Sequence, residues 1–75
     1  MKTKLTAILR EEEDMTVAFT PELDITSQGS TAKEALANLK EAVELFLEAA
    51  SPAEVEGRLA PDAWITQFEA DVATA

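Results

Sequence analysis

The first part of the chain alternates apolar and polar side chains with a period of two, which is typical of β-strands. The alternation covers residues 3–11, 15–20 and 24–28. Four consecutive acids, Glu11 to Asp14, separate the first two stretches and prefer solvent to a packed site, as a hairpin turn requires. Pro21 lacks a backbone N–H and should end the second strand. We therefore expect three strands, of which the first two form an antiparallel hairpin.

The period then changes to that of an amphipathic helix, predicted over residues 31–50. Thr31 and Glu34 have the spacing of a capping box, and Gly29 can adopt the backbone angles that end a strand. Apolar side chains follow at steps of three and four. They are Ala32, Ala35, Leu36, Leu39, Ala42, Val43, Phe46, Leu47 and Ala50.

Two further elements are predicted after this helix. Ser51 followed by Pro52 resembles a new helix start, so we expect a short helix over residues 52–57 that Gly57 ends. Residues 63–72 alternate again, which predicts a fourth strand with one packed and one solvated face.

The predicted order is strand, strand, strand, helix, strand in one domain of residues 1–75. This is an α+β fold with a three-to-four-stranded, mainly antiparallel sheet and one long helix packed on one face. A chain of 75 residues buries little more than half of the surface that it exposes when unfolded. We therefore expect self-association into a homodimer or a higher homo-oligomer.

Fifteen acidic and six basic residues give a formal net charge of −9. A field of this sign repels phosphates, so we expect no direct binding to nucleic acid. It would steer a basic protein partner toward the surface, although ordinary solubility accounts for the same charge.

The composition lacks the usual chemistry of catalytic sites. The chain has no cysteine and no histidine, so it has no thiol nucleophile, thiolate ligand or imidazole base. We expect neither an enzyme nor a cofactor or bound metal. No apolar run approaches the length of a membrane span, and no signal peptide is recognisable, so a cytoplasmic location is expected.

The candidate partner-binding residues are chosen by charge and by the position of one aromatic side chain. They are Glu11, Glu12, Glu13 and Asp14 in the predicted turn, Glu41, Glu44 and Glu48 along the helix, and Trp64 at the start of the last strand. A carboxylate metal site in the turn is a weaker alternative, because consecutive exposed residues rarely converge on one ion. A single tryptophan at a strand start is either a core anchor or an interface anchor.

A series of short motifs runs along the strands and the long helix in a fixed order. They are Ala18-Phe19, Pro21-Glu22-Leu23 and Ser27-Gln28-Gly29 with Thr31, then Glu34-Ala35-Leu36, Asn38-Leu39 and Glu41-Ala42-Val43-Glu44-Leu45. In these motifs the chain resembles the HicB-like antitoxins of type II toxin–antitoxin systems. The resemblance covers residues 3 to 48 and implies a reduced RNase H-like β-β-β-α-β fold. Many members also carry a DNA-binding module after this unit, and we expect this chain to be a short form without one.

The resemblance implies a function as well. HicB-like antitoxins bind HicA, a small basic ribonuclease that cleaves messenger RNA, and cover its active site. Two alternatives remain open. A solitary HicB-like oligomer would have a structural or regulatory role and no toxin, whereas a metal-dependent RNase H-like nuclease would need inward carboxylates that the first two strands lack.

Overall fold

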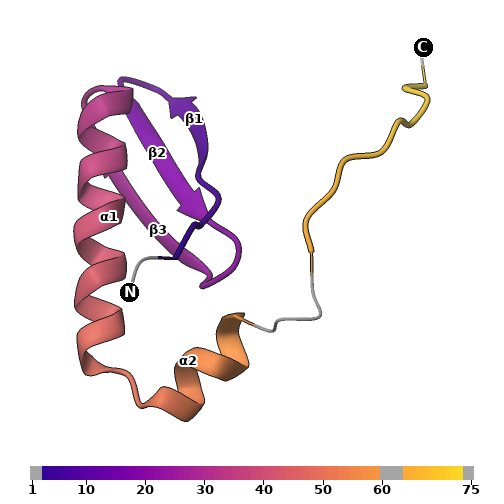
Figure 1. Ribbon diagram of the computed structural model, residues 1–75. Helices are drawn as coiled ribbons and strands as arrows, with labels where there is room; N and C mark the ends of the chain where they lie inside the picture. The colour runs from indigo at the N-terminus through magenta and orange to yellow at the C-terminus, as the bar shows by residue number, and fades with distance from the viewer. Residues whose placement is uncertain (1–2, 60–63, 74–75) are drawn as a thin grey trace.

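The computed structural model describes residues 3–59 and 64–73 and has an α+β fold (Figure 1). Three strands form an antiparallel sheet in the order β1-β2-β3, and the long helix α1 packs on one face of it. A shorter helix, α2, follows. The elements are β1 (Ile8–Glu12), β2 (Met15–Thr20), β3 (Ile25–Gly29), α1 (Ala32–Ala49) and α2 (Pro52–Leu59). The predicted hairpin and the long helix on the sheet are confirmed.

Strand β1 begins five residues later than predicted, because β2, the strand that pairs with it, ends at Thr20. Ile8 pairs with Phe19, and extending this register by two residues would place Thr6 opposite Pro21. Proline has no N–H to donate to the ladder, so pairing stops at this point. Residues 3–7 precede β1 and make no ladder pairs, although Leu5 and Ala7 still pack against the core.

The two faces of β2 differ in burial. Thr16, Ala18 and Thr20 point toward α1 and are buried. The apolar residues Val17 and Phe19 lie on the opposite face of the sheet and are half-buried. The helix therefore packs on small side chains, which lets α1 approach the sheet closely.

Helix α1 begins as the capping box predicts, with one shift in position. The backbone N–H of Glu34 donates to Thr31 Oγ1 at 3.1 Å. The carboxylate of Glu34 reaches back one residue further than expected, accepting from the backbone N–H of Ser30 at 3.0 Å. Three side chains of α1, those of Ala35, Leu39 and Val43, are buried and join Ala18 and Leu23 in the core.

Helix α2 is longer than predicted, because it passes through Gly57 and ends at Leu59. Ser51 caps it by accepting from the backbone N–H of Glu54 at 3.2 Å. Glycine inside a helix costs only about 1 kcal/mol relative to alanine. The Arg58 guanidinium offsets part of this cost, since it donates to the Leu23 carbonyl at 2.8 Å.

The fourth strand, predicted over residues 63–72, is wrong over residues 64–72, while Ala63 lies outside the described residues. Residues 64–73 form no strand and are exposed at every position. They lead away from the sheet and helices (Figure 1). Side chains therefore alternate here although none of the three described strands pairs with this segment to supply hydrogen bonds.

Candidate functional site

Helix α1 lies off the centre of the sheet. It packs mainly on β3 and β2 and makes few contacts with β1. Asn38 fixes it at the β3 side by donating from Nδ2 to the Gln28 carbonyl at 2.8 Å. The helix-facing side of β1 and of residues 3–7 is consequently only partly covered.

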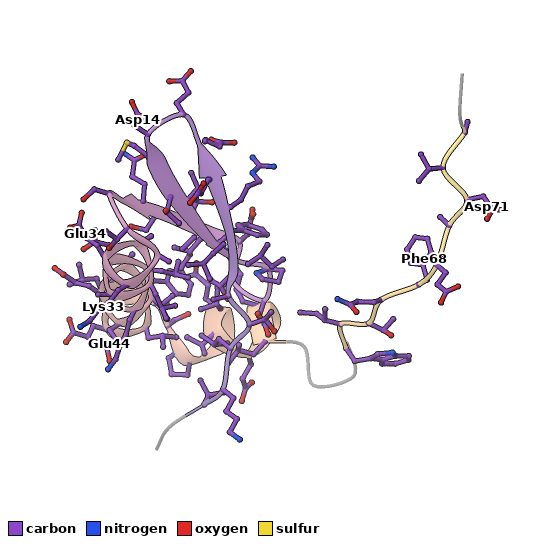
Figure 2. All side chains as sticks on the ribbon, turned by 90° about the horizontal axis from the view of Figure 1, so that it is seen from above. Asp14, Lys33, Glu34, Glu44, Phe68 and Asp71 are labelled. Atoms are coloured by element: carbon purple, nitrogen blue, oxygen red, sulfur yellow. The ribbon has the colours of Figure 1, made fainter. Side chains whose placement is uncertain are left out.

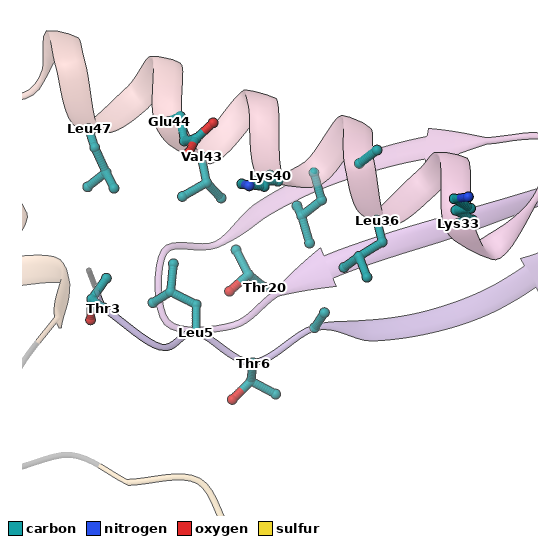
Figure 3. A pocket seen from close by; sticks show the side chains of 13 residues that line it. Thr3, Leu5, Thr6, Thr20, Lys33, Leu36, Lys40, Val43, Glu44 and Leu47 are labelled. Carbon is teal, nitrogen blue, oxygen red and sulfur yellow. The ribbon is translucent and has the colours of Figure 1, made fainter. Parts of the chain in front are cut away.

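This offset creates a groove of about 670 Å³ between α1 and residues 3–7. In Figure 3, Leu36, Val43 and Leu47 point from α1 toward the opposite wall, where Leu5 points back at the helix. Leu36 is 47% exposed although it belongs to the apolar stripe. The groove is therefore an apolar channel that the chain's own side chains leave partly open.

The charged residues of the groove all come from α1. Lys33 and Lys40 line it together with Glu44 (Figure 3). The groove thus has more positive than negative side chains, in a chain whose net charge is −9. An apolar ligand with negative charge fits this lining better than one with positive charge.

Residues 3–7 form one wall of the groove, and Glu22 holds this wall in place. Its two carboxylate oxygens accept from the Thr6 backbone N–H at 3.0 and 2.9 Å, and Oε2 also accepts from Thr6 Oγ1 at 2.7 Å. Thr20 Oγ1 donates to Oε1 at 3.1 Å. This carboxylate replaces the ladder bonds that Pro21 cannot make.

Opposing effects act on the pKa of Glu22. Burial raises this pKa, but the hydrogen bonds from Thr6, from the backbone of Glu22 itself and from Thr20 together outweigh burial and leave the pKa below its ordinary value. The folded chain therefore favours the ionised carboxylate at this position.

A second, smaller cavity of about 390 Å³ lies on the other side of Glu22, beside α2. Arg58 lines it and stacks over the Phe46 ring, with its guanidinium carbon 5.2 Å from the ring centroid. Trp64 and Ile65 also line this cavity, so the 64–73 segment starts next to Glu22.

The predicted acidic residues are exposed but lie in two separate places. Glu11, Glu12, Glu13 and Asp14 surround the tip of the β1–β2 hairpin, with Glu12 paired to Arg10. Glu41, Glu44 and Glu48 lie along α1, and Figure 2 shows Asp14 and Glu44 on different elements. Of these seven acids, Glu44 alone lines a groove described above.

Trp64 is not a core residue, because it is 82% exposed. Further along the same segment, Phe68 is 89% and Val72 86% exposed. Figure 2 shows Phe68 and Asp71 on a part of the chain that stands away from the sheet and α1. Large apolar side chains are thus presented to solvent on an extended backbone.

Among residues 3–59 and 64–73, no three acidic side chains come together as a metal site would require. In the same ranges no helix is long and apolar enough to cross a membrane. No protein-family model, curated protein or solved structure matches the chain.

The groove is the feature that sequence reasoning missed. The signal was present in the width of the apolar stripe on α1, which has more large residues than a three-stranded sheet can cover. Leu39 and Val43 are buried, whereas Leu36 stays half-exposed in the groove. A stripe wider than its sheet predicts an uncovered face.

Proposed function

We propose that the chain is a non-catalytic, protein-binding module of the antitoxin type, which acts in the cytoplasm. Its partner would be a basic HicA-type ribonuclease, and binding would cover the active site of that toxin. The observation that supports this proposal is the exposure of all seven candidate acids, together with Trp64. Acidic groups that are already solvated and accessible can meet a basic partner with little rearrangement of the fold.

Two surfaces are available to such a partner. The hairpin tip concentrates four acids in consecutive positions, and the exposed side of α1 adds Glu41 and Glu48. Surface charges of this kind raise association rates more than they raise affinity, because long-range attraction acts before contact. Exposed apolar side chains such as Trp64 would then supply the desolvated contact that affinity requires.

The test is inhibition of a HicA-type toxin encoded beside this chain, measured as messenger RNA cleavage against the molar ratio of the two proteins. We expect complete inhibition near a fixed stoichiometry. In stopped-flow binding, Glu41→Lys combined with Glu48→Lys should lower the association rate constant about tenfold at low salt and flatten its salt dependence.

The matched control combines Glu54→Lys with Glu56→Lys on α2, which changes the net charge by the same amount. A protein that leaves cleavage unaffected at excess would contradict the proposal. Equal effects of the two double variants would show that only the total charge matters, and would remove α1 from the interface.

A second candidate is a solitary oligomer with a structural or regulatory role and no toxin. The exposure of the 64–73 segment favours it, because large apolar side chains in solvent point to association. A chain that forms a stable assembly but binds no basic protein from the neighbouring reading frame would support this candidate over the antitoxin.

A further inference from the structure

The 64–73 segment and the groove beside α1 are complementary features of the same chain. The segment exposes apolar side chains on an extended backbone, and the groove is an extended apolar channel that lacks a cover. We propose that the 64–73 segment of one copy docks in the groove of a second copy, and that reciprocal exchange makes the chain a dimer. This inference stands independently of any toxin.

The lengths of the two features agree. From Lys33 to Leu47 the groove follows α1 for about 21 Å at 1.5 Å per residue. From Trp64 to Val72 an extended chain covers about 26 Å at 3.3 Å per residue. The segment therefore reaches along the whole groove.

The side-chain pattern of the segment also suits a channel between a helix and a strand edge. One face alternates large and small groups, with Trp64, Phe68 and Val72 separated by Thr66 and Ala70. Small residues at intermediate positions let the large ones enter the channel between the leucine side chains that line it. The other face carries Gln67, Glu69 and Asp71 after Ile65, is the more polar of the two, and would stay in solvent.

The charges that line the groove also favour the 64–73 segment as its occupant. Residues 64–73 contain Glu69 and Asp71 and no basic residue. The groove is lined by Lys33 and Lys40 against a single acid, Glu44. The groove is thus a net positive site in an acidic chain, and the docked segment would hold its two acids at the solvent-facing rim of this site.

A second copy is the expected donor because the segment leaves its own body. It starts beside Glu22 and then leads away from the sheet and α1 (Figure 1). Within residues 3–59, the core has only five buried apolar side chains: Ala18, Leu23, Ala35, Leu39 and Val43. Covering Leu36 and burying Trp64 and Phe68 adds the apolar burial that so small a core lacks.

Four single variants test the exchange. Leu36→Glu damages the groove and Phe68→Ser damages the segment. Leu45→Glu is the control for the first, because Leu45 is an exposed leucine of α1 that does not line the groove. Gln67→Ser is the control on the polar face. All four positions are exposed, so far-UV circular dichroism should show the fold retained.

Light scattering after gel filtration should give twice the chain mass of 8.1 kDa for the wild type and both controls. The two damaging variants should dissociate at concentrations at least tenfold higher than the wild type does. Mixing them should restore dimers, because one intact groove and one intact segment remain in each mixed pair. A monomeric wild type, or dimers of unchanged stability in both damaging variants, would overturn the proposal.

A cross-link separates exchange from folding back onto the same chain. The sequence has no cysteine, so Leu36→Cys combined with Phe68→Cys introduces the sole pair of thiols. A short bismaleimide should join these thiols between chains and yield covalent dimers. An internal link at monomer mass, or no link at all, would overturn the exchange.

Discussion

Glu13 is the residue at which the hairpin turn is strained. Its φ of 54° lies in the left-handed region, which costs a residue with a Cβ about 1–2 kcal/mol. The turn adopts this angle because a tight hairpin needs positive φ near its tip, and the sequence supplies an acid there in place of glycine or asparagine. Three other acids surround it, so the turn combines backbone strain with repulsion between like charges.

Replacing Glu13 by glycine should stabilise the chain. We expect Glu13→Gly to raise the free energy of unfolding in urea by about 0.5–1 kcal/mol, since relief of the strained φ exceeds the added entropy of the unfolded chain. Glu13→Gln is the control, because it removes the charge but keeps the Cβ. A glycine variant no more stable than the glutamine variant would show that charge, and not backbone strain, dominates this turn.

Gly29 is required for space. Its φ is not positive, and an added Cβ would lie 2.6 Å from the backbone nitrogen of Ala35 and 2.9 Å from the carbonyl carbon of Glu34. We expect Gly29→Ala to lower the free energy of unfolding by about 1–3 kcal/mol, because the first turn of α1 would have to move off β3.

The chain carries its own control for this substitution. A Cβ at Gly57 would meet nothing within 4 Å. Gly57→Ala should therefore stabilise α2 by up to about 1 kcal/mol through helix propensity alone. Thermal unfolding of both variants measures the contrast, and a stabilising Gly29→Ala would contradict the close approach of α1 to β3.

At the scale of elements, Glu22 joins residues 3–7 to the end of β2. Its pKa in the folded chain is lower than its ordinary value of 4.5, so the ionised form is the one that stabilises the fold. This contribution is complete above about pH 4.5 and is lost as the pH falls through the pKa of the folded chain. Acid should therefore loosen the groove wall.

Glu22→Gln should cost about 1–2 kcal/mol of unfolding free energy at neutral pH, because an amide nitrogen would face the Thr6 N–H. The difference from the wild type should shrink as the pH falls below 4.5. Glu41→Gln subtracts the general effect of removing one exposed carboxylate. A difference between Glu22→Gln and the wild type that stays constant down to pH 3 would refute the role given to this carboxylate.

The elements that could be predicted are those whose signals are local. The Thr31 and Glu34 spacing located the start of α1, and Pro21 located the end of β2. The start of β1 depended on what lay opposite it, which only the register reveals. The alternation of residues 64–73 was real, but a strand also needs a neighbour, and no strand in the described part of the chain pairs with this segment.

The candidate site could be predicted only in part for the same reason. Charge and exposure of single residues follow from the sequence, and all seven candidate acids are exposed. Their separation into two places follows from the fold. The groove depends on the sideways position of α1 over the sheet, which the local pattern does not encode.

At the scale of the whole molecule, the chain is small and leaves much of its apolar surface in contact with water. Its sheet has one face under α1 and another on which Val17 and Phe19 are only half-buried. Its groove and its 64–73 segment leave further apolar surface in water. Stability of such a molecule is expected to depend on what binds it, because a ligand that binds the folded state alone adds its binding free energy to that of folding.

The exposed aromatic residues of the 64–73 segment bear on how long the chain survives. Proteases cut extended, accessible backbone, and Trp64 and Phe68 lie on such backbone in the unassembled chain. Docking would hide both cleavage points. Free chains would then be degraded sooner than assembled chains. Proteolysis in the cell would thereby keep the total amount of this protein close to the amount that is assembled.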